Sequence, residues 1–428
     1  MRVALVCVIL LAVVTIPARN AFPPDETLAD LTKDTRVQRA LAKLGADSRA
    51  TTEEQIRITE IPAPPFHESA RGAYLAKLLS GAGLTVETDG MGNVIGHRAG
   101  AVRNDIVLVT AHLDTVFPAG TNVRVRREGG RLYAPGISDN GAGLAALVAV
   151  ARAMQDAGIA TRSTILFAAD VGEEGEGNLR GIRRLVESYG GRLRYVMALD
   201  GASTDYIAVA ALASRRVEIT VSGPGGHSWS DFGVPNPIHA LARGITRFVN
   251  MPVPETPRTS YNVGEIEGGT SVNSIPAKAS IKIDLRSESE PVLAKLESTL
   301  RESIQSGLTD EMEASHRRGI SPGYGLTLET RVLGIRPGGE LPASSPLLAA
   351  VQAADDYLNN NSRIERSSTD ANIPLSLGIH AVSLGAGGRS GGAHTLGEWY
   401  DPAGRELGLR RVLLTILQVA QLAGPGGG

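Results

Sequence analysis

Apolar and polar positions follow two different patterns along the chain. Between residues 106 and 199, short apolar runs of strand length alternate with longer segments whose apolar residues have helical spacing. Strands that alternate with helices predict an α/β domain with a mainly parallel sheet covered on both faces. The predicted elements are a strand at Ile106–Thr110, a helix at Gly141–Ala157, a strand at Thr164–Ala169, a helix at Leu179–Tyr189 and a strand at Tyr195–Leu199.

The pattern changes after about Ala211. Residues 279–286 alternate strictly, with Ile281, Ile283 and Leu285 on one face of a strand. The predicted elements here are a strand at Arg216–Val221, a helix at Pro237–Val249, strands at Ser260–Glu267 and Ala279–Arg286, a helix at Pro291–Leu308 and a strand at Leu326–Val332. This order, βαββαβ, is the ferredoxin-like arrangement.

The α/β pattern resumes after this region. It is carried by a helix at Leu347–Leu358, a strand at Ala381–Leu384 and a helix at Gly404–Leu422. We therefore expect an α+β domain at residues 212–335, inserted into an α/β domain that consists of residues 25–211 and 336–428.

The chain begins with Met1-Arg2, a nearly unbroken apolar run from Val3 to Ile16, and then Pro17-Ala18. A basic start, a short apolar run and a small residue are typical of a secretory signal peptide. We expect residues 1–18 to be removed and the protein to be secreted or periplasmic. A leader that stays attached and anchors the chain in a membrane is the alternative.

Charge and composition narrow the possible chemistry. The formal net charge is −2 and aromatic residues make up 4% of the chain, so neither a basic surface nor a base-stacking surface points to nucleic acid. The single cysteine, Cys7, lies in the predicted leader. Any metal site must therefore use histidine, aspartate and glutamate.

Acidic and histidine residues follow the predicted strands or lie in the loops beside them. They form the clusters His112-Leu113-Asp114, Asp139-Asn140, Glu173-Glu174, Asp200-Gly201 and His394. Ligands bind beyond the carboxyl ends of strands in open α/β sheets, so all of these clusters can converge there. Each cluster alone is more typical of a structural or surface residue. Together they predict a site in which carboxylates and imidazoles hold two metals that acidify one water.

Several segments of the chain resemble the M20 family of dinuclear zinc metallopeptidases. They are TAHLDTVFPAG, APGISDNGAGLAALVAV, FAADVGEEGEGNLRG, ALDG, GGHSW, GGTSVNSIPAKASIKIDLR and GGAHTLGEWYD. The resemblance spans about Asp47 to Leu422 and favours the peptidase T or carboxypeptidase G2-like branch. It implies a zinc-exopeptidase-like catalytic domain, with the inserted ferredoxin-like domain as a lid and dimerisation domain.

The resemblance also implies a metal-ligand set. His112 and Asp200 would hold one zinc, Glu174 and His394 would hold the other, and Asp139 would bridge the two. Co²⁺ or Mn²⁺ could take the place of zinc, because histidine and carboxylate ligands bind all three metals.

Further roles follow from the same resemblance. Glu173 would be the general base, Asp114 would orient His112, and the Asp139–Asn140 peptide is expected to be cis. In the lid, His227 resembles a histidine that reaches the partner subunit's site and stabilises the oxyanion, so we expect a homodimer formed through the lid.

Two lid residues match positions that contact substrate. They are Asn273 and Arg286, and the guanidinium of Arg286 suits a terminal carboxylate. A surface role at the end of a strand is the alternative for Arg286. Backbone N–H groups of the loop at Gly385–Gly392 could bind the same carboxylate.

The predicted function is that of a secreted or periplasmic exopeptidase that hydrolyses the amide bonds of small peptides. The alternative within the family is a deacylase whose substrate is an N-acyl amino acid. A more distant alternative is a non-catalytic binding protein that kept the peptidase fold.

Overall fold

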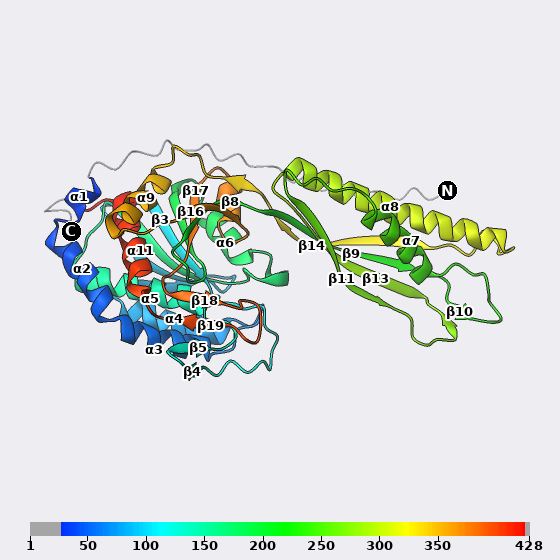
Figure 1. Cartoon of the computed structure of the whole chain (residues 1–428), viewed down its shortest axis with the longest axis horizontal. Helices are drawn as coiled ribbons and strands as arrows, with labels where there is room; N and C mark the ends of the chain where they lie inside the picture. The colour runs from blue at the N-terminus through cyan, green and yellow to red at the C-terminus, as the bar shows by residue number, and fades with distance from the viewer. Residues whose placement is uncertain (1–26, 424–428) are drawn as a thin grey trace.

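A nine-stranded sheet lies at the centre of the larger of two units in the computed structural model, which describes residues 27–423 (Figure 1). The predicted leader, residues 1–18, lies outside this range. In the part of the chain that is described, no helix combines the length and the apolar character needed to span a membrane. The strands of this sheet are β1 (Thr85–Thr88), β2 (Val94–Arg98), β3 (Val102–His112), β6 (Ser163–Asp170), β7 (Leu193–Leu199), β8 (Tyr206–Ala211), β15 (Gly339–Glu340), β16 (Arg363–Ser367) and β17 (His380–Leu384).

The middle of this sheet is parallel and its edges are antiparallel. The strand order is β1-β2-β6-β3-β7-β17-β8-β15, with β16 paired to β8. β3 runs parallel to β6 and β7, and β17 runs parallel to β7, whereas β1, β2 and β15 add antiparallel pairs. Every residue of β6 is buried. Both faces of the sheet are therefore covered at β6, because successive side chains point to opposite faces. The predicted α/β fold with a mainly parallel sheet is confirmed.

Helices before, between and after these strands pack on the sheet. α5 begins after Asn140, whose side-chain oxygen accepts a hydrogen bond from the N–H of Gly143 (3.1 Å) and caps the helix. α5 and α11 pack against β3 and β6 in the main apolar core. The helices of this unit are α1 (Leu28–Leu31), α2 (Thr35–Ala46), α3 (Ser48–Thr59), α4 (Ser69–Gly81), α5 (Gly141–Asp156), α6 (Arg180–Tyr189), α9 (Pro346–Leu358), α10 (Asn372–Ser376) and α11 (Arg405–Ala420).

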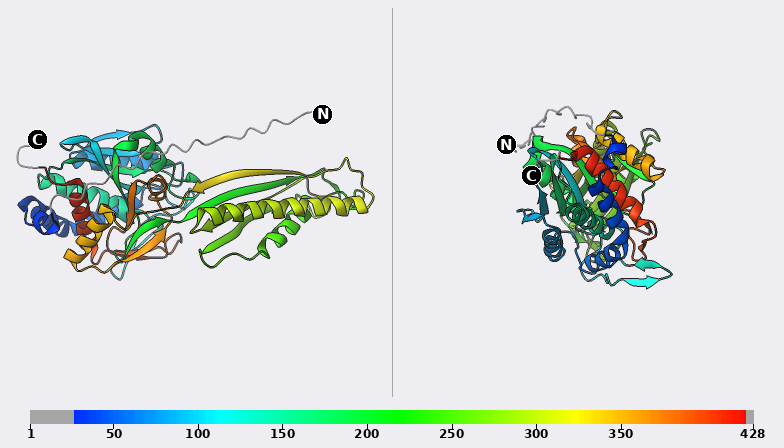
Figure 2. Two further views of the ribbon diagram at one scale, coloured as in Figure 1. Left: turned by 90° about the horizontal axis from the view of Figure 1, so that it is seen from above. Right: turned by 90° about the vertical axis from the view of Figure 1, so that its left-hand side faces the viewer.

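The smaller unit is elongated and has its own apolar core (Figures 1 and 2). Its elements follow one another in the predicted βαββαβ order: β9 (Ala213–Ser222), α7 (Pro237–Val249), β11 (Thr259–Gly268), β13 (Lys278–Ser287), α8 (Glu290–Arg317) and β14 (Thr327–Arg336). The strands form an antiparallel sheet in the order β11-β13-β9-β14. Side chains of Ile281, Ile283 and Leu285 are buried in the core shared with α7 and α8, as their alternation predicts.

Two features of the fold differ from the sequence pattern. α8 extends to Arg317, beyond the predicted end at Leu308, because Ala314 and Ser315 are still buried there. A second small sheet in the larger unit, with order β18-β19-β5-β4, is not predicted. Its strands are only three residues long: β4 (Arg126–Glu128), β5 (Arg131–Tyr133), β18 (Arg389–Gly391) and β19 (Trp399–Asp401). Strands of this length have too few positions to show an alternation.

Candidate metal centre and active site

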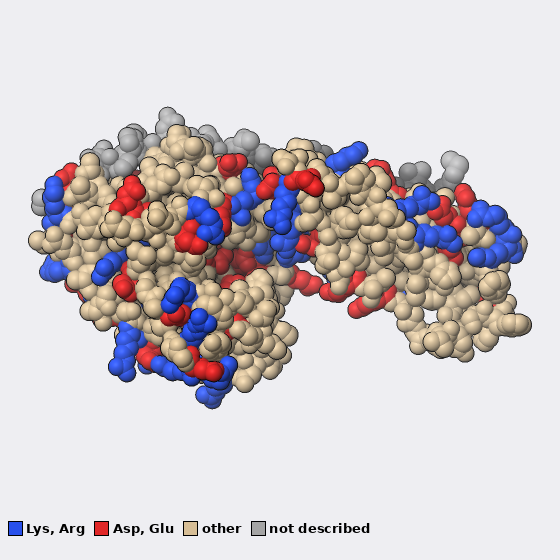
Figure 3. Space-filling model, viewed as in Figure 1, with Lys and Arg blue, Asp and Glu red and all other residues tan. Residues whose placement is uncertain are grey.

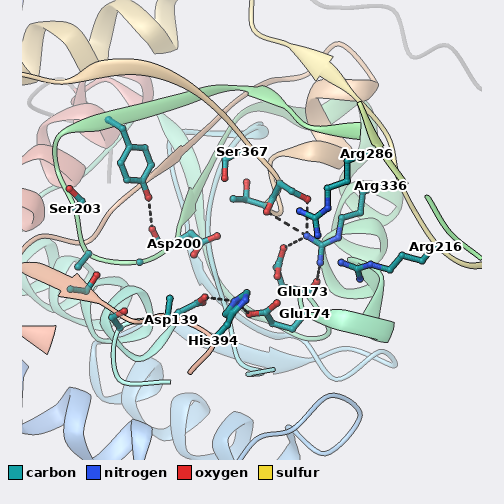
Figure 4. Close-up of a pocket in the computed structure, with 18 residues that line it drawn as sticks. Asp139, Glu173, Glu174, Asp200, Ser203, Arg216, Arg286, Arg336, Ser367 and His394 are labelled. Atoms are coloured by element: carbon teal, nitrogen blue, oxygen red, sulfur yellow. Dashed lines mark hydrogen bonds and ion pairs between the residues drawn. The ribbon is translucent and has the colours of Figure 1, made fainter. Parts of the chain in front are cut away.

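A pocket of about 370 Å³ lies between the two units, at the carboxyl ends of β3 and β7. Figure 3 shows a hollow at this junction with acidic side chains on its wall. His112 is the last residue of β3, and Asp200 directly follows β7. The residues that line the pocket are Ser138, Asp139, Glu173, Glu174, Asp200, Gly201, Ala202, Ser203, Tyr206, Arg216, Arg286, Arg336, Ser367, Ser368, Thr369, Ser390, Ala393 and His394 (Figure 4).

The structure brings the five predicted metal ligands together in two groups that share Asp139. In one group, Nε2 of His112 lies 3.0 Å from Oδ1 of Asp139 and 4.0 Å from Oδ1 of Asp200. In the other, Nε2 of His394 lies 3.0 Å from Oδ2 of Asp139 and 2.9 Å from Oε1 of Glu174. The two oxygens of one carboxylate thus face two different histidines. The Asp139–Asn140 peptide is cis, as expected.

The donor atoms of these groups fit divalent cations. Oδ1 of Asp139 is buried and has no hydrogen-bond partner among the described residues, although Nε2 of His112 is 3.0 Å away. A buried oxygen without a hydrogen bond destabilises the fold unless another group, such as a bound cation, interacts with it. The donors are imidazole nitrogens and carboxylate oxygens, a set that zinc, cobalt and manganese accept.

Crowding of the carboxylates changes the protonation of the site. Burial and the neighbouring charge of Glu173 raise the pKa of Glu174 to about 7. Burial and the charge of Asp139 raise the pKa of Asp200 well above its ordinary value. Hydrogen bonds to Asp139 and Glu174 raise the pKa of His394 to about 10. Without a cation, protons are therefore held among the same groups that would serve as ligands.

Asp114 connects two segments that carry candidate ligands. Its carboxylate is fully buried and accepts hydrogen bonds from the N–H groups of Glu173 (3.0 Å) and Glu174 (2.8 Å). Nδ1 of His112 lies 3.1 Å from the main-chain oxygen of Asp114 and 3.7 Å from its Oδ1. Of these two oxygens, the carbonyl oxygen lies nearer to Nδ1 of His112, while the carboxylate holds the Glu173–Glu174 segment.

Glu173 has a partner that the sequence does not reveal. Its Oε1 accepts a hydrogen bond from Nη1 of Arg336 (2.8 Å), and both side chains are almost fully buried. Nη1 of Arg336 also donates to Oγ of Ser368 (3.0 Å). Glu174, in contrast, faces His394. The adjacent glutamates therefore have different hydrogen-bond partners, although both also lie near His112, with which they form a third possible metal group.

The segment after Glu174 contacts the smaller unit. The carbonyl oxygen of Gly175 accepts a hydrogen bond from Nη1 of Arg216 on β9 (2.6 Å). Oδ1 of Asn178 accepts one from the N–H of Ile335 on β14 (2.9 Å). The same loop thus belongs to the pocket and to the junction between the units.

The predicted substrate residues lie in two different places. Arg286 lines the pocket, where its Nε donates to Oδ2 of Asp284 (2.6 Å). His227 and Asn273 are not among the pocket residues. They lie at a two-stranded antiparallel ribbon formed by β10 (Gly226–His227) and β12 (Ser274–Ile275), at the far end of the smaller unit, with Asn273 directly before β12, and both are exposed (Figure 1). Within one chain, the structure does not bring these two residues to the site.

Three arginines line the pocket: Arg216, Arg286 and Arg336 (Figure 4). The sequence predicts only Arg286 as a site residue. Arg216 occupies a polar position of the alternating strand β9, where an inward-facing functional residue looks like any surface residue. Arg336 is the last residue of β14 and lies 163 positions from Glu173. No spacing in the sequence indicates that pair.

Comparison with known proteins identifies the family. The model of Peptidase family M20/M25/M40 matches residues 108–418, well over half of the chain. The protein belongs to this family. Carboxypeptidase G2 of Pseudomonas sp. is 24% identical to this M20 protein over 230 residues, which cover 51% of this chain and 54% of that enzyme. The uncharacterized protein YqjE of Bacillus subtilis is 25% identical over 355 residues, 78% of this chain and 89% of that protein.

A solved structure has the same fold. The crystal structure of aminopeptidase PepT from Bacillus cereus matches with a TM-score of 0.68 and 22% identity, covering 87% of this chain and 99% of that one. Family membership confirms the predicted enzyme class: the M20 protein is a hydrolase of the metallopeptidase and amidohydrolase type, in a family that depends on metal, typically zinc.

Proposed function

We propose that this M20 protein is an exopeptidase that hydrolyses amide bonds of small peptides with two divalent cations. The position of the Asp139 carboxylate supports this most, because its two oxygens each lie 3.0 Å from a different histidine. His112 and Asp200 would hold one cation, Glu174 and His394 the other, and Asp139 would bridge them. We expect zinc, with Co²⁺ or Mn²⁺ able to replace it. When bound, such a pair supplies an acidified water as nucleophile at neutral pH.

Glu173 is the residue that we assign as general base. Its carboxylate lines the pocket beside the candidate ligands, and Arg336 holds its Oε1 in place. We propose that this carboxylate takes a proton from the attacking water and delivers it to the leaving nitrogen. Asp114 would keep Glu173 in position through the hydrogen bond that it accepts from the Glu173 N–H.

The wall of the pocket that the smaller unit forms, with Arg216 and Arg286, supports a substrate with a free carboxylate. Among the described residues, Arg216 and Arg286 share one acidic partner, Asp284, so these three side chains together keep a net positive charge. A guanidinium matches the geometry of a carboxylate and forms charge-assisted hydrogen bonds with it. A pocket of about 370 Å³ is at the small end of the range for ligand sites, which favours short peptides.

We propose that residues 212–335 act as a lid and form a homodimer. His227 and Asn273 lie at the ribbon of β10 and β12, outside their own chain's pocket, in the same region as Trp229 and Phe232, which are 86% and 73% exposed. Figure 3 shows that the lower part of this end of the smaller unit is largely uncharged, whereas Lys and Arg side chains gather on its upper part. An exposed apolar surface of this kind marks an interaction site. A second copy that uses it could supply His227 to the partner's pocket, where it would stabilise the oxyanion.

We also propose that the enzyme is exported, on the strength of residues 1–18. Fractionation of cells that express the full chain tests this: the enzyme should be found outside the cytoplasm and should lack the leader. Recovery of full-length protein in the cytoplasm would refute export.

Hydrolysis of a defined peptide library tests the proposed reaction. The library contains di- and tripeptides, the same peptides blocked at either end, and N-acyl amino acids, and mass spectrometry identifies the products. We expect removal of one terminal residue, loss of activity after chelation, and recovery with Zn²⁺, Co²⁺ or Mn²⁺. Cleavage of N-acyl amino acids alone would favour the deacylase, and metal-loaded protein that cleaves no amide would refute an enzymatic function.

A further inference from the structure

Glu398 is a fully buried acid that the proposed reaction does not use. It lies four residues after His394 and directly before β19. Among the described residues, no ion pair gives it a cationic partner, and burial raises the pKa of its carboxyl. Burying a carboxylate without a counterion costs several kcal/mol. The hydrogen bonds that the carboxylate of Glu398 accepts must therefore offset this cost.

These hydrogen bonds all come from the segment that carries Asp139. Oε2 of Glu398 accepts a hydrogen bond from the N–H of Gly136 (2.8 Å). Oε1 accepts hydrogen bonds from the N–H groups of Ser138 (2.8 Å) and Asp139 (2.9 Å). The carbonyl oxygen of Glu398 also accepts from the N–H of Ala134 (3.2 Å). One residue therefore fixes this segment at four positions and binds the backbone of Asp139 directly.

We propose that Glu398 is a positioning residue that holds Asp139 in the geometry needed to bridge two cations. Because Glu398 and His394 lie on the same short loop, the hydrogen bonds also fix the distance between the segments of these two candidate ligands. Residues that orient metal ligands in this way typically contribute about 10- to 100-fold to metal affinity. This inference rests on the proposed two-cation site.

Glu398→Gln is the variant that tests the inference. The glutamine oxygen can still accept hydrogen bonds from the N–H groups of Ser138 and Asp139. The glutamine NH₂ group would face the N–H of Gly136, and these two groups cannot form a hydrogen bond because both are donors. The shape is kept and the charge and one hydrogen bond are lost. The control is Glu311→Gln on α8, far from the pocket: this buried glutamate also accepts a hydrogen bond from a backbone N–H (Asn236, 3.3 Å) but, unlike Glu398, is paired with Arg243 (3.1 Å).

Zinc affinity is measured on the full-length protein by competition with a fluorescent chelator, alongside the thermal unfolding temperature of the metal-free protein. We expect Glu398→Gln to bind zinc about 10- to 100-fold more weakly than the wild type, and Glu311→Gln to bind it unchanged. Saturating zinc should restore most of the activity of Glu398→Gln, because the reacting groups are intact.

A zinc affinity of Glu398→Gln within about twofold of the wild type would overturn the inference, since ligand-orienting residues normally have larger effects. If this variant does not fold, Glu398→Asp, which keeps the charge but shortens the side chain, decides by the same measurement. Wild-type protein that binds no zinc would instead refute the proposed cation site itself.

Discussion

Replacement of Glu173 by glutamine separates its role as a base from its role in the structure. Glutamine has the same shape, and its oxygen can still accept the hydrogen bond that Nη1 of Arg336 makes to Oε1 (2.8 Å). The variant loses the ability to take a proton. General-base catalysis contributes about 10²- to 10⁴-fold, so we expect kcat to fall by that factor, or about 3–5 kcal/mol in the barrier.

The same change leaves Arg336 without a formal counterion. Breaking a buried ion pair usually costs about 3–5 kcal/mol of folding stability. The cost should be smaller here, because the glutamine oxygen can still accept a hydrogen bond from Arg336, and Arg336 keeps its bond to Ser368. We therefore expect the variant to fold and to bind zinc like the wild type.

The assay is the steady-state rate on the best peptide from the library, at saturating zinc, together with metal content. Glu176→Gln is the matched control, because Glu176 lies on the same loop but its side chain is 67% exposed. Glu173→Gln with a kcat within about tenfold of the wild type would refute the assignment of the base, since a lost base costs at least about 10². Equal losses in both variants would point to damage of the loop instead.

The remaining predictions concern protons, substrate and assembly. Because the pKa values of Glu174 and His394 are raised to about 7 and about 10, His394 is protonated and Glu174 is about half protonated at neutral pH in the metal-free protein, and zinc must displace these protons. Apparent zinc affinity should thus increase as the pH rises, and calorimetry in buffers of different ionisation enthalpy should detect proton release; a pH-independent affinity would contradict this. Arg286→Gln should raise KM for substrates with a free carboxylate by about 10- to 100-fold, the equivalent of one charged hydrogen bond, with little change in kcat; an equal effect on carboxylate-blocked peptides would speak against direct contact. Mixing the inactive Glu173→Gln and His227→Ala variants should restore about a quarter of the wild-type activity, because half of the randomly formed dimers carry one complete site out of two. No recovery in a mixture shown to exchange subunits would exclude donation of His227 between subunits.

The sequence predicts best the elements whose pattern is long and has a clear beginning. α7 has the predicted bounds, Pro237–Val249, because Asn236 caps an amphipathic helix that starts with proline. Strands such as β4 are too short and too polar for any alternation to appear. In the site, the ligand set came from motifs that each lie within a few residues. Arg336 could not be found in that way, because its contact with Glu173 depends on how the two units are packed together.

The loop that carries Glu173 and Glu174 limits how this enzyme can be recombined with its relatives. Through Gly175 and Asn178 it is hydrogen-bonded to β9 and β14, so the active-site loop and the inserted unit are matched surfaces. A chimera that takes residues 212–335 from another family member and keeps this loop should lose these contacts. The smallest exchangeable module is therefore the inserted unit together with residues 173–178 and Arg336, and we expect changes in these parts of the chain to be compatible only in combination.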